Sequence, residues 1–83
     1  MTTTRAEISQ WFDEGAAQGA THMIIMCDTF DYCDYPTFIT EPDPEKAKAI
    51  VDQKNQNMQQ VMEVYNLSMD RDTQLRQGLA FNY

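Results

Sequence analysis

Long hydrophobic runs are missing from this sequence, and so are glycine-rich loops, internal repeats and clusters of basic residues. No run approaches the ~18–20 apolar residues that a membrane-spanning helix needs. Polar residues fill the N-terminal segment 1–10, where a signal peptide would be apolar. We therefore expect a cytoplasmic protein without a membrane partner. With only three glycines, no loop is evident that would hold phosphate groups.

Basic residues are scarce as well. The chain has six Lys and Arg against thirteen Asp and Glu, which gives a formal net charge of −7. Direct binding to nucleic acid is not expected, because affinity for phosphates comes largely from Lys and Arg. The remaining partners are basic proteins, cations or a second copy of the chain. The charge is also explained by solubility alone.

Cysteine and histidine are too few for a metal site. A small secreted domain would normally hold more than the two cysteines, Cys27 and Cys33. The only zinc-like combination joins them to His22 and Asp28. In a strand, however, His22 and Cys27 point to opposite faces and do not converge on one ion. No nucleophile–base pair is visible. We expect no metal, no cofactor, no catalytic residue and no enzymatic activity.

The residues that are present predict a single α+β domain over 1–83, in the order α-β-β-α with a short C-terminal helix. The first helix opens at Thr4, since Thr4 and Glu7 fit a capping box. Apolar residues then recur at spacings of three and four. Gly19 suits the left-handed conformation that ends a helix.

A second helix is predicted to start at the cap Asp43, with Pro44 in the first helical position. A stripe of apolar residues at helical spacing extends this helix to Tyr65. Beyond it, Asp70 or Ser68 caps a short third helix. Leu75 and Leu79 of that helix are expected to face inward, and the apolar tail 79–83 is expected to dock.

Two strands lie between the long helices, over about 21–30 and 35–40, and the turn 31–34 joins them into an antiparallel hairpin packed on two helices. The centre of the first strand, 23–27, is apolar without alternation, which predicts burial on both faces. The turn length sets Phe30 opposite Tyr35 and Met26 opposite Ile39.

Both faces of this hairpin are therefore apolar, and an isolated hairpin is marginal in water. Two helices cover one face and leave the other face and an open edge, which are templates for association. We expect a homo-oligomer, with a dimer as its simplest form. The alternative is that the third helix and the 79–83 tail cover the second face within one chain.

Several segments resemble a family of small uncharacterised proteins of bacteria and phages. They are GATHM at 19–23, CDTFD at 27–31, DYP at 34–36 and VMEVY at 61–65. The resemblance covers most of the chain and brings no known activity, cofactor or substrate. It implies an accessory protein of a phage or mobile element that interferes with a host defence.

The candidate binding residues lie around the acidic turn: Asp28, Asp31, Tyr32, Asp34 and Tyr35. Tyrosines beside carboxylates suit a basic peptide, or a ribose with an amino-bearing base. The simpler interpretation is that the carboxylates accept backbone N–H bonds within the turn. We expect a non-catalytic acidic module that binds a basic host protein. The alternative is sequestration of a small nucleotide-type ligand between subunits, and catalysis through Asp28 ranks third.

Overall fold

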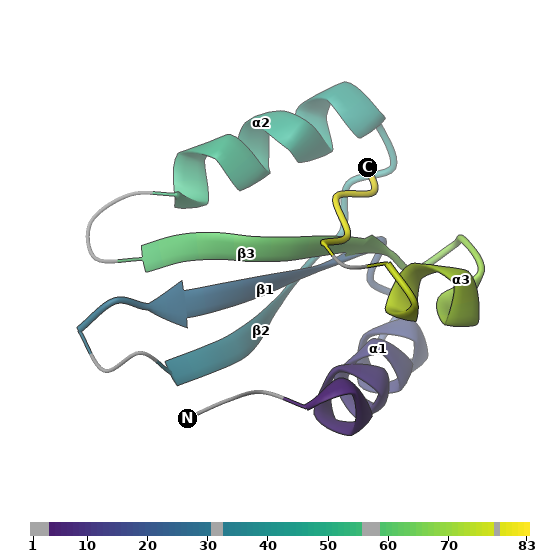
Figure 1. The fold of residues 1–83 in the computed structure, drawn as a ribbon. Coiled ribbons are helices and arrows are strands. Elements are labelled where there is room, and N and C mark those ends of the chain that lie inside the picture. Colours follow the sequence, from purple (N-terminus) through teal and green to yellow (C-terminus); the bar gives the residue numbers. More distant parts are fainter. Residues whose placement is uncertain (1–3, 31–32, 56–58, 78) are drawn as a thin grey trace.

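The computed structural model describes residues 4–30, 33–55, 59–77 and 79–83. Helices and strands follow in the order α-β-β-α-β-α (Figure 1). Their bounds are α1 Arg5–Ala17, β1 His22–Asp28, β2 Cys33–Ile39, α2 Pro44–Lys54, β3 Gln59–Asn66 and α3 Arg71–Leu75. The α+β class is confirmed, but the sheet has three strands and is not a two-stranded hairpin.

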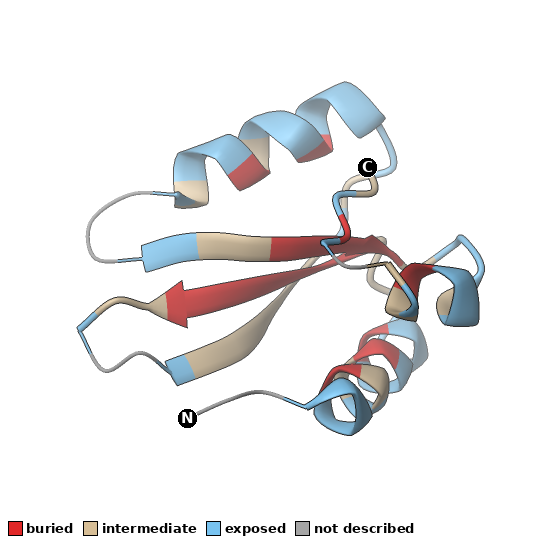
Figure 2. Cartoon of the chain, in the orientation of Figure 1, coloured by how far each residue is buried: buried red, intermediate tan, exposed pale blue. Residues whose placement is uncertain are grey.

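Strand β1 lies in the centre of the sheet, in the order β2-β1-β3, and both pairings are antiparallel. It is buried along almost its whole length (Figure 2). The predicted burial of β1 on both faces is therefore confirmed.

The predicted register of the hairpin is wrong by four residues. Met26 pairs with Tyr35 and His22 with Ile39, because β2 already begins at Cys33. Strand β1 ends at Asp28, not near Phe30 as predicted. An even shift leaves every side chain on its predicted face, since side chains in a strand alternate with a period of two.

One face of the sheet packs on α1 and the other on α2 (Figure 1). The α1 side buries Ile8, Phe12, Met23, Ile25, Tyr65 and Ala80. The α2 side buries Ile24, Met26, Val51 and Val64, with Tyr83 packed against them. Both faces are thus covered within one chain. The second face is covered by α2, with Tyr83 of the tail beside it, whereas Leu75 of α3 packs on the α1 side. The expectations that both long helices share one face, and that the third helix covers the other, are therefore wrong.

The long second helix is the main error of the sequence prediction. Helix α2 ends at Lys54, and residues 59–66 form β3. The register of β3 against β1 shifts between Ile25 and Met26, which marks a β-bulge. The bulge places Val61 and Val64 on the same face, against α2. Their spacing of three resembles a helical stripe in the sequence.

The predicted helix caps are confirmed. Thr4 Oγ1 accepts from the Glu7 N–H at 3.2 Å, and Asp43 Oδ1 accepts from the Glu45 N–H at 3.0 Å. Asp70 caps α3 by accepting from the Thr73 N–H at 2.9 Å. Gly19 follows α1 with a φ of 79°, as expected for a left-handed helix end.

The outer edge of β3 is covered by groups of the same chain. The Val64 N–H donates to Ala80 O, and the Asn82 N–H donates to Val64 O. Two residues further along β3, at Asn66, the side-chain amide of Gln74 makes the hydrogen bonds that a neighbouring strand would make. It accepts from the Asn66 N–H and donates to Asn66 O, both at 2.8 Å. The tail therefore docks in cis, although Leu79 is 71% exposed and not inward as predicted.

No helix in the described part of the chain is both long and apolar enough to cross a membrane.

Candidate functional site

The predicted binding residues gather at the end of the hairpin where β1 stops and β2 starts. Asp28 is the last residue of β1, and Asp34 and Tyr35 are the second and third residues of β2. Asp31 and Tyr32 lie outside the described residues. The structure thus brings Asp28, Asp34 and Tyr35 to one end of the sheet.

Asp28 acts within the turn. Its Oδ1 accepts a hydrogen bond from the Phe30 N–H at 2.8 Å, which is the turn chemistry that the sequence favoured. The bond fixes the backbone N–H of Phe30 next to the end of β1. The Phe30 side chain is 72% exposed, the highest value among the large hydrophobic residues described. The sequence analysis did not select Phe30 as a binding residue.

Asp34 and Tyr35 have neighbours inside the fold. Asp34 lies opposite Cys27 in the sheet. Burial, followed by the hydrogen bond to the Asp34 carboxylate, raises the pKa of the Cys27 thiol. A thiol held in this way is a poor nucleophile. Tyr35 is half-buried and packs against the core on the α2 side, so only part of its ring is available to a partner.

Neither cysteine forms a disulfide: Cys27 is buried and Cys33 is exposed. Among the described residues, no group of three or more His, Cys, Asp or Glu side chains is arranged to hold a metal ion.

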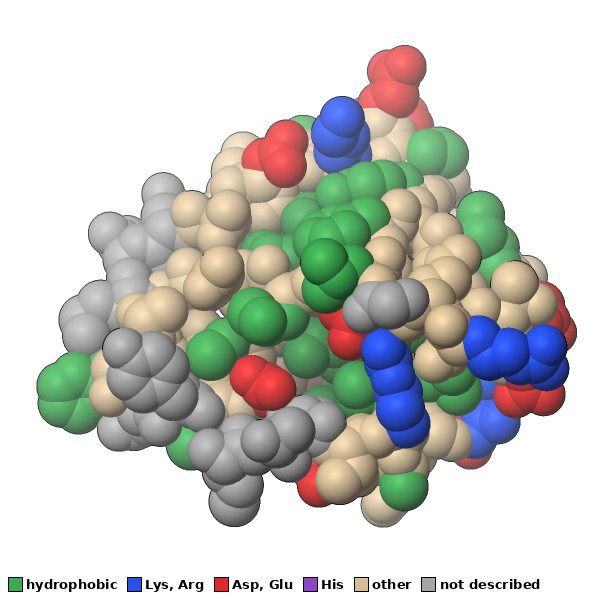
Figure 3. All heavy atoms as spheres, viewed as in Figure 1, with side chains coloured by type: hydrophobic (Ala, Val, Ile, Leu, Met, Phe, Trp, Pro, Cys, Tyr) green, Lys and Arg blue, Asp and Glu red, His purple; other side chains and the backbone are tan. Residues whose placement is uncertain are grey.

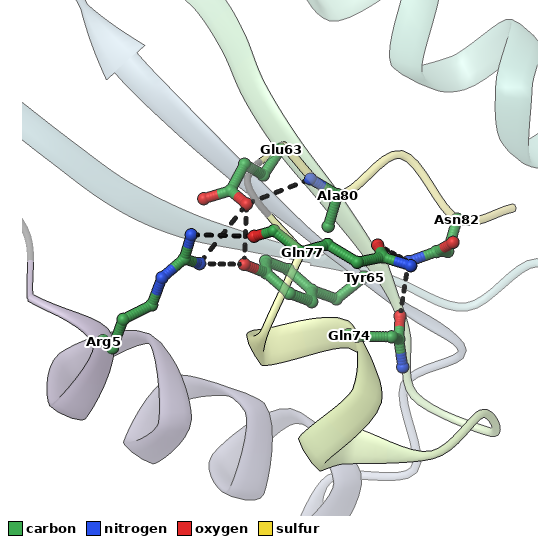
Figure 4. A network of polar contacts seen from close by, with 7 residues as sticks. All are labelled: Arg5, Glu63, Tyr65, Gln74, Gln77, Ala80 and Asn82. Carbon is green, nitrogen blue, oxygen red and sulfur yellow. Dashed lines mark hydrogen bonds and ion pairs between the residues drawn. The ribbon is translucent and has the colours of Figure 1, made fainter.

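A second polar group joins α1, β3 and the C-terminal segment (Figure 4). Tyr65 Oη donates to Glu63 Oε2 at 2.8 Å and accepts from Arg5 Nη1 at 2.9 Å. Glu63 Oε2 also accepts from the Ala80 N–H at 3.1 Å, and Arg5 Nη2 donates to Gln77 O at 2.9 Å. Burial and the hydrogen bond to Glu63 raise the pKa of Tyr65 above that of a free tyrosine. Arg5 Nη1 and Nη2, Glu63 Oε2 and Tyr65 Oη all have partners inside the fold, so these contacts stabilise the structure.

A cavity of about 520 Å³ lies at the opposite end of β1 from the turn. It is lined by Ala16 and Ala20 near the end of α1, Thr21 and His22 at the start of β1, Pro42 and Pro44 at the start of α2, 66–69 after β3, and Tyr83. The volume lies in the range of small-molecule sites.

His22 is the polar side chain of interest in this lining. It is 3% exposed, and its Nδ1 lies 2.9 Å from Thr21 Oγ1. His22 is therefore a buried histidine with a polar neighbour at Nδ1. Its Nε2, however, is buried and has no hydrogen-bond partner among the described residues. Nothing in the sequence pattern distinguishes His22 from an ordinary core histidine.

Hydrophobic side chains also gather near the centre of the face drawn in Figure 3. Leu79 and Phe81 of the C-terminal segment are exposed to 71% and 48%.

Comparison with known proteins identified no relative: no family model, no curated protein and no solved structure matches this chain.

Proposed function

We propose that this protein is a non-catalytic binding module that contacts a basic protein through the end of the β1–β2 hairpin. The observation that carries the proposal is the exposed ring of Phe30, whose backbone N–H is bound by Asp28 at an acidic end of the molecule. Interfaces take much of their energy from an aromatic anchor, and surrounding charges set the choice of partner.

The charge around this anchor has one sign. From Asp28 to Glu45 the chain contains no Lys or Arg, whereas Asp28, Asp31 and Asp34 surround Phe30 in sequence. A basic partner would be steered toward this end, and binding would weaken as salt increases. The role as a phage or mobile-element accessory protein that acts on a host defence depends on the sequence resemblance alone.

Self-association remains a prediction, but its original reason no longer applies. Self-association was expected because one face of the hairpin would be uncovered. In the structure, helices of the same chain cover both faces of the sheet. The competing idea, a nucleotide held between subunits, also remains a prediction, and the cavity within one chain does not support it. The side chains that line the cavity include no Lys or Arg to bind a phosphate.

Affinity capture from a bacterial lysate, followed by titration of the purified captured protein, tests the proposal. Phe30→Ser removes the anchor without removing core contacts, and Leu79→Ser is a matched control because Leu79 is equally exposed. We expect Phe30→Ser to weaken binding by about tenfold or more, equivalent to ~1.4 kcal/mol. Equal binding by the two variants would reject Phe30 as the anchor.

A second pair of variants tests the charge. We expect Asp34→Lys to reduce binding and its dependence on salt, while Glu14→Lys on the exposed face of α1 keeps both. Thermal melting of Asp34→Lys checks that the fold survives, since Asp34 interacts with Cys27. Partners that bind independently of salt would contradict a basic contact surface.

A further inference from the structure

We infer that the cavity beside His22 is a binding site for a small, neutral, planar molecule with an amide-type edge, in which an N–H lies next to a carbonyl oxygen. The site lies at the other end of β1 from Phe30 and is independent of the protein contact proposed above.

His22, which is among the residues that line the cavity, has one ring nitrogen without a hydrogen-bond partner among the described residues. His22 Nδ1 lies within hydrogen-bond distance of Thr21 Oγ1, whereas His22 Nε2 is buried without a partner among the described residues. Burying a polar atom without a hydrogen bond destabilises the fold, so a ligand that supplies the bond gains affinity. If Nε2 carries hydrogen, it needs an acceptor, and if it carries a lone pair, it needs a donor. An amide-type edge offers both, side by side.

The second argument is the arrangement of Thr21, which holds the ring in place. Its hydroxyl accepts from the Glu41 N–H at 2.7 Å and lies 3.2 Å from both Ile39 O and Glu41 O. Thr21 is thereby tied to the end of β2 and the segment that leads into α2. The imidazole that bonds to it is positioned before any ligand arrives, which reduces the entropy cost of binding.

The third argument is the charge of the lining. The cavity lining contains no Lys, Arg, Asp or Glu, and the chain carries a formal net charge of −7. A phosphate or carboxylate would find no counter-charge there, and a buried unpaired ion is costly. A neutral ligand avoids both penalties.

The fourth argument is the shape of the apolar lining. Pro42, Pro44 and Tyr83 contribute rings, and Leu67 and Met69 contribute flexible apolar groups. Such surfaces suit the flat faces of a heteroaromatic ring, with polar contacts confined to its edge. The simplest competing occupant of the unmet bond is an ordered water molecule.

The ring signals of His22 provide the test, because this is the only histidine of the chain. Carbon–proton NMR spectra of the labelled protein are recorded during titration with nicotinamide, uracil, 2-pyridone and hypoxanthine. Nicotinate is the charged analogue of nicotinamide. We expect saturable shifts with the neutral compounds and at least about tenfold weaker binding of nicotinate, a difference of ~1.4 kcal/mol.

Two alanines of α1 give a matched pair of variants. Ala16 lines the cavity and Ala17 does not, and both side chains are exposed. Leucine is a good helix former, so both variants should fold. We expect Ala16→Leu to weaken binding about tenfold or more and Ala17→Leu to leave it unchanged. His22→Phe should weaken it similarly, because the ring stays and Nε2 is lost.

Three results would overturn the inference. They are no saturable shift with any of the four compounds, equal binding of nicotinamide and nicotinate, or equal binding by the Ala16→Leu and Ala17→Leu variants. The first result would mean that only a water molecule binds His22 Nε2.

Discussion

At Gly15, helix α1 approaches the sheet so closely that a side chain does not fit. A Cβ at this position would lie 2.6 Å from Phe38 Cε1 and 2.9 Å from Leu67 Cδ1. Gly15 therefore lets α1 bury Ile8 and Phe12 against the sheet. The glycine is used for close packing, although it lowers helix propensity.

The Gly15→Ala variant separates the effect of close packing from the effect of helix propensity. Helix propensity alone would make alanine more stable by about 1 kcal/mol. Because the Phe38 ring is in the way, we expect Gly15→Ala to lower the free energy of unfolding by about 1–3 kcal/mol. Chemical denaturation measures the change, with Ala17→Gly on the exposed face as a propensity control. A stabilised Gly15→Ala variant would show that the ring moves aside easily.

At the scale of single elements, the sheet protects its two edges differently. The edge of β3 is closed by the C-terminal segment and by the Gln74 amide. Among the strands that the structure describes, β2 has only β1 as a neighbour, and it carries Pro36 near its middle. Proline is tolerated on an edge strand and removes a donor that a second chain would need.

Gln74→Glu tests the closure of the β3 edge. The change replaces the Nε2 donor by a carboxylate oxygen beside Asn66 O and leaves the size of the side chain the same. We expect a loss of about 1–3 kcal/mol of stability, because a buried carbonyl loses its donor. Denaturant titration measures it, and faster amide exchange at Asn66 should accompany it. Gln53→Glu on exposed α2 is the control, and an equal effect there would contradict a specific role.

Pro36→Val tests the protection of the β2 edge. Valine favours a strand and adds an N–H at the centre of this strand. We expect stronger self-association, measured by sedimentation velocity over a range of concentrations. Thr37→Val raises the apolar character of β2 without adding a donor, and serves as the control. An unchanged sedimentation profile for Pro36→Val would mean that the proline does not limit edge pairing.

At the scale of the whole molecule, one polar group ties the first helix to the last residues of the chain. Arg5, Glu63 and Tyr65 connect α1, β3 and the segment around Ala80 (Figure 4). Tyr65 is fully buried, and a phenolate there would face the Glu63 carboxylate. Tyr65 therefore holds its proton more tightly in the folded chain than in the unfolded one.

This difference predicts a pH dependence of stability. Since the folded pKa of Tyr65 is above the unfolded value of 10.0, its contribution is complete below pH 10 and is lost as the pH rises further. We expect Tyr65→Phe to be less stable than the wild type by about 1–3 kcal/mol at neutral pH. The difference in stability between the wild type and Tyr65→Phe should become smaller at alkaline pH. Denaturant titrations at neutral and alkaline pH measure it, and a constant gap would contradict the assignment.

Prediction from the sequence succeeds where a feature depends on neighbouring residues. The caps at Thr4, Asp43 and Asp70 are local hydrogen bonds. The two faces of β1 were assigned correctly despite a wrong register, because the alternation of side chains survives an even shift. Of the candidate site, Asp28, Asp34 and Tyr35 do share one end of the sheet, whereas the exposed Phe30 beside them was missed.

The sequence by itself determined the helix caps, the apolar centre of β1 and the excess of acid around the turn, since each depends on residues close together in the chain. Only the tertiary structure decided that 59–66 is a strand. Its bulge spaces Val61 and Val64 like a helix, and pairing with β1 outweighs that local pattern. The cavity beside His22 was likewise decided by folding, because its lining comes from segments far apart in the chain.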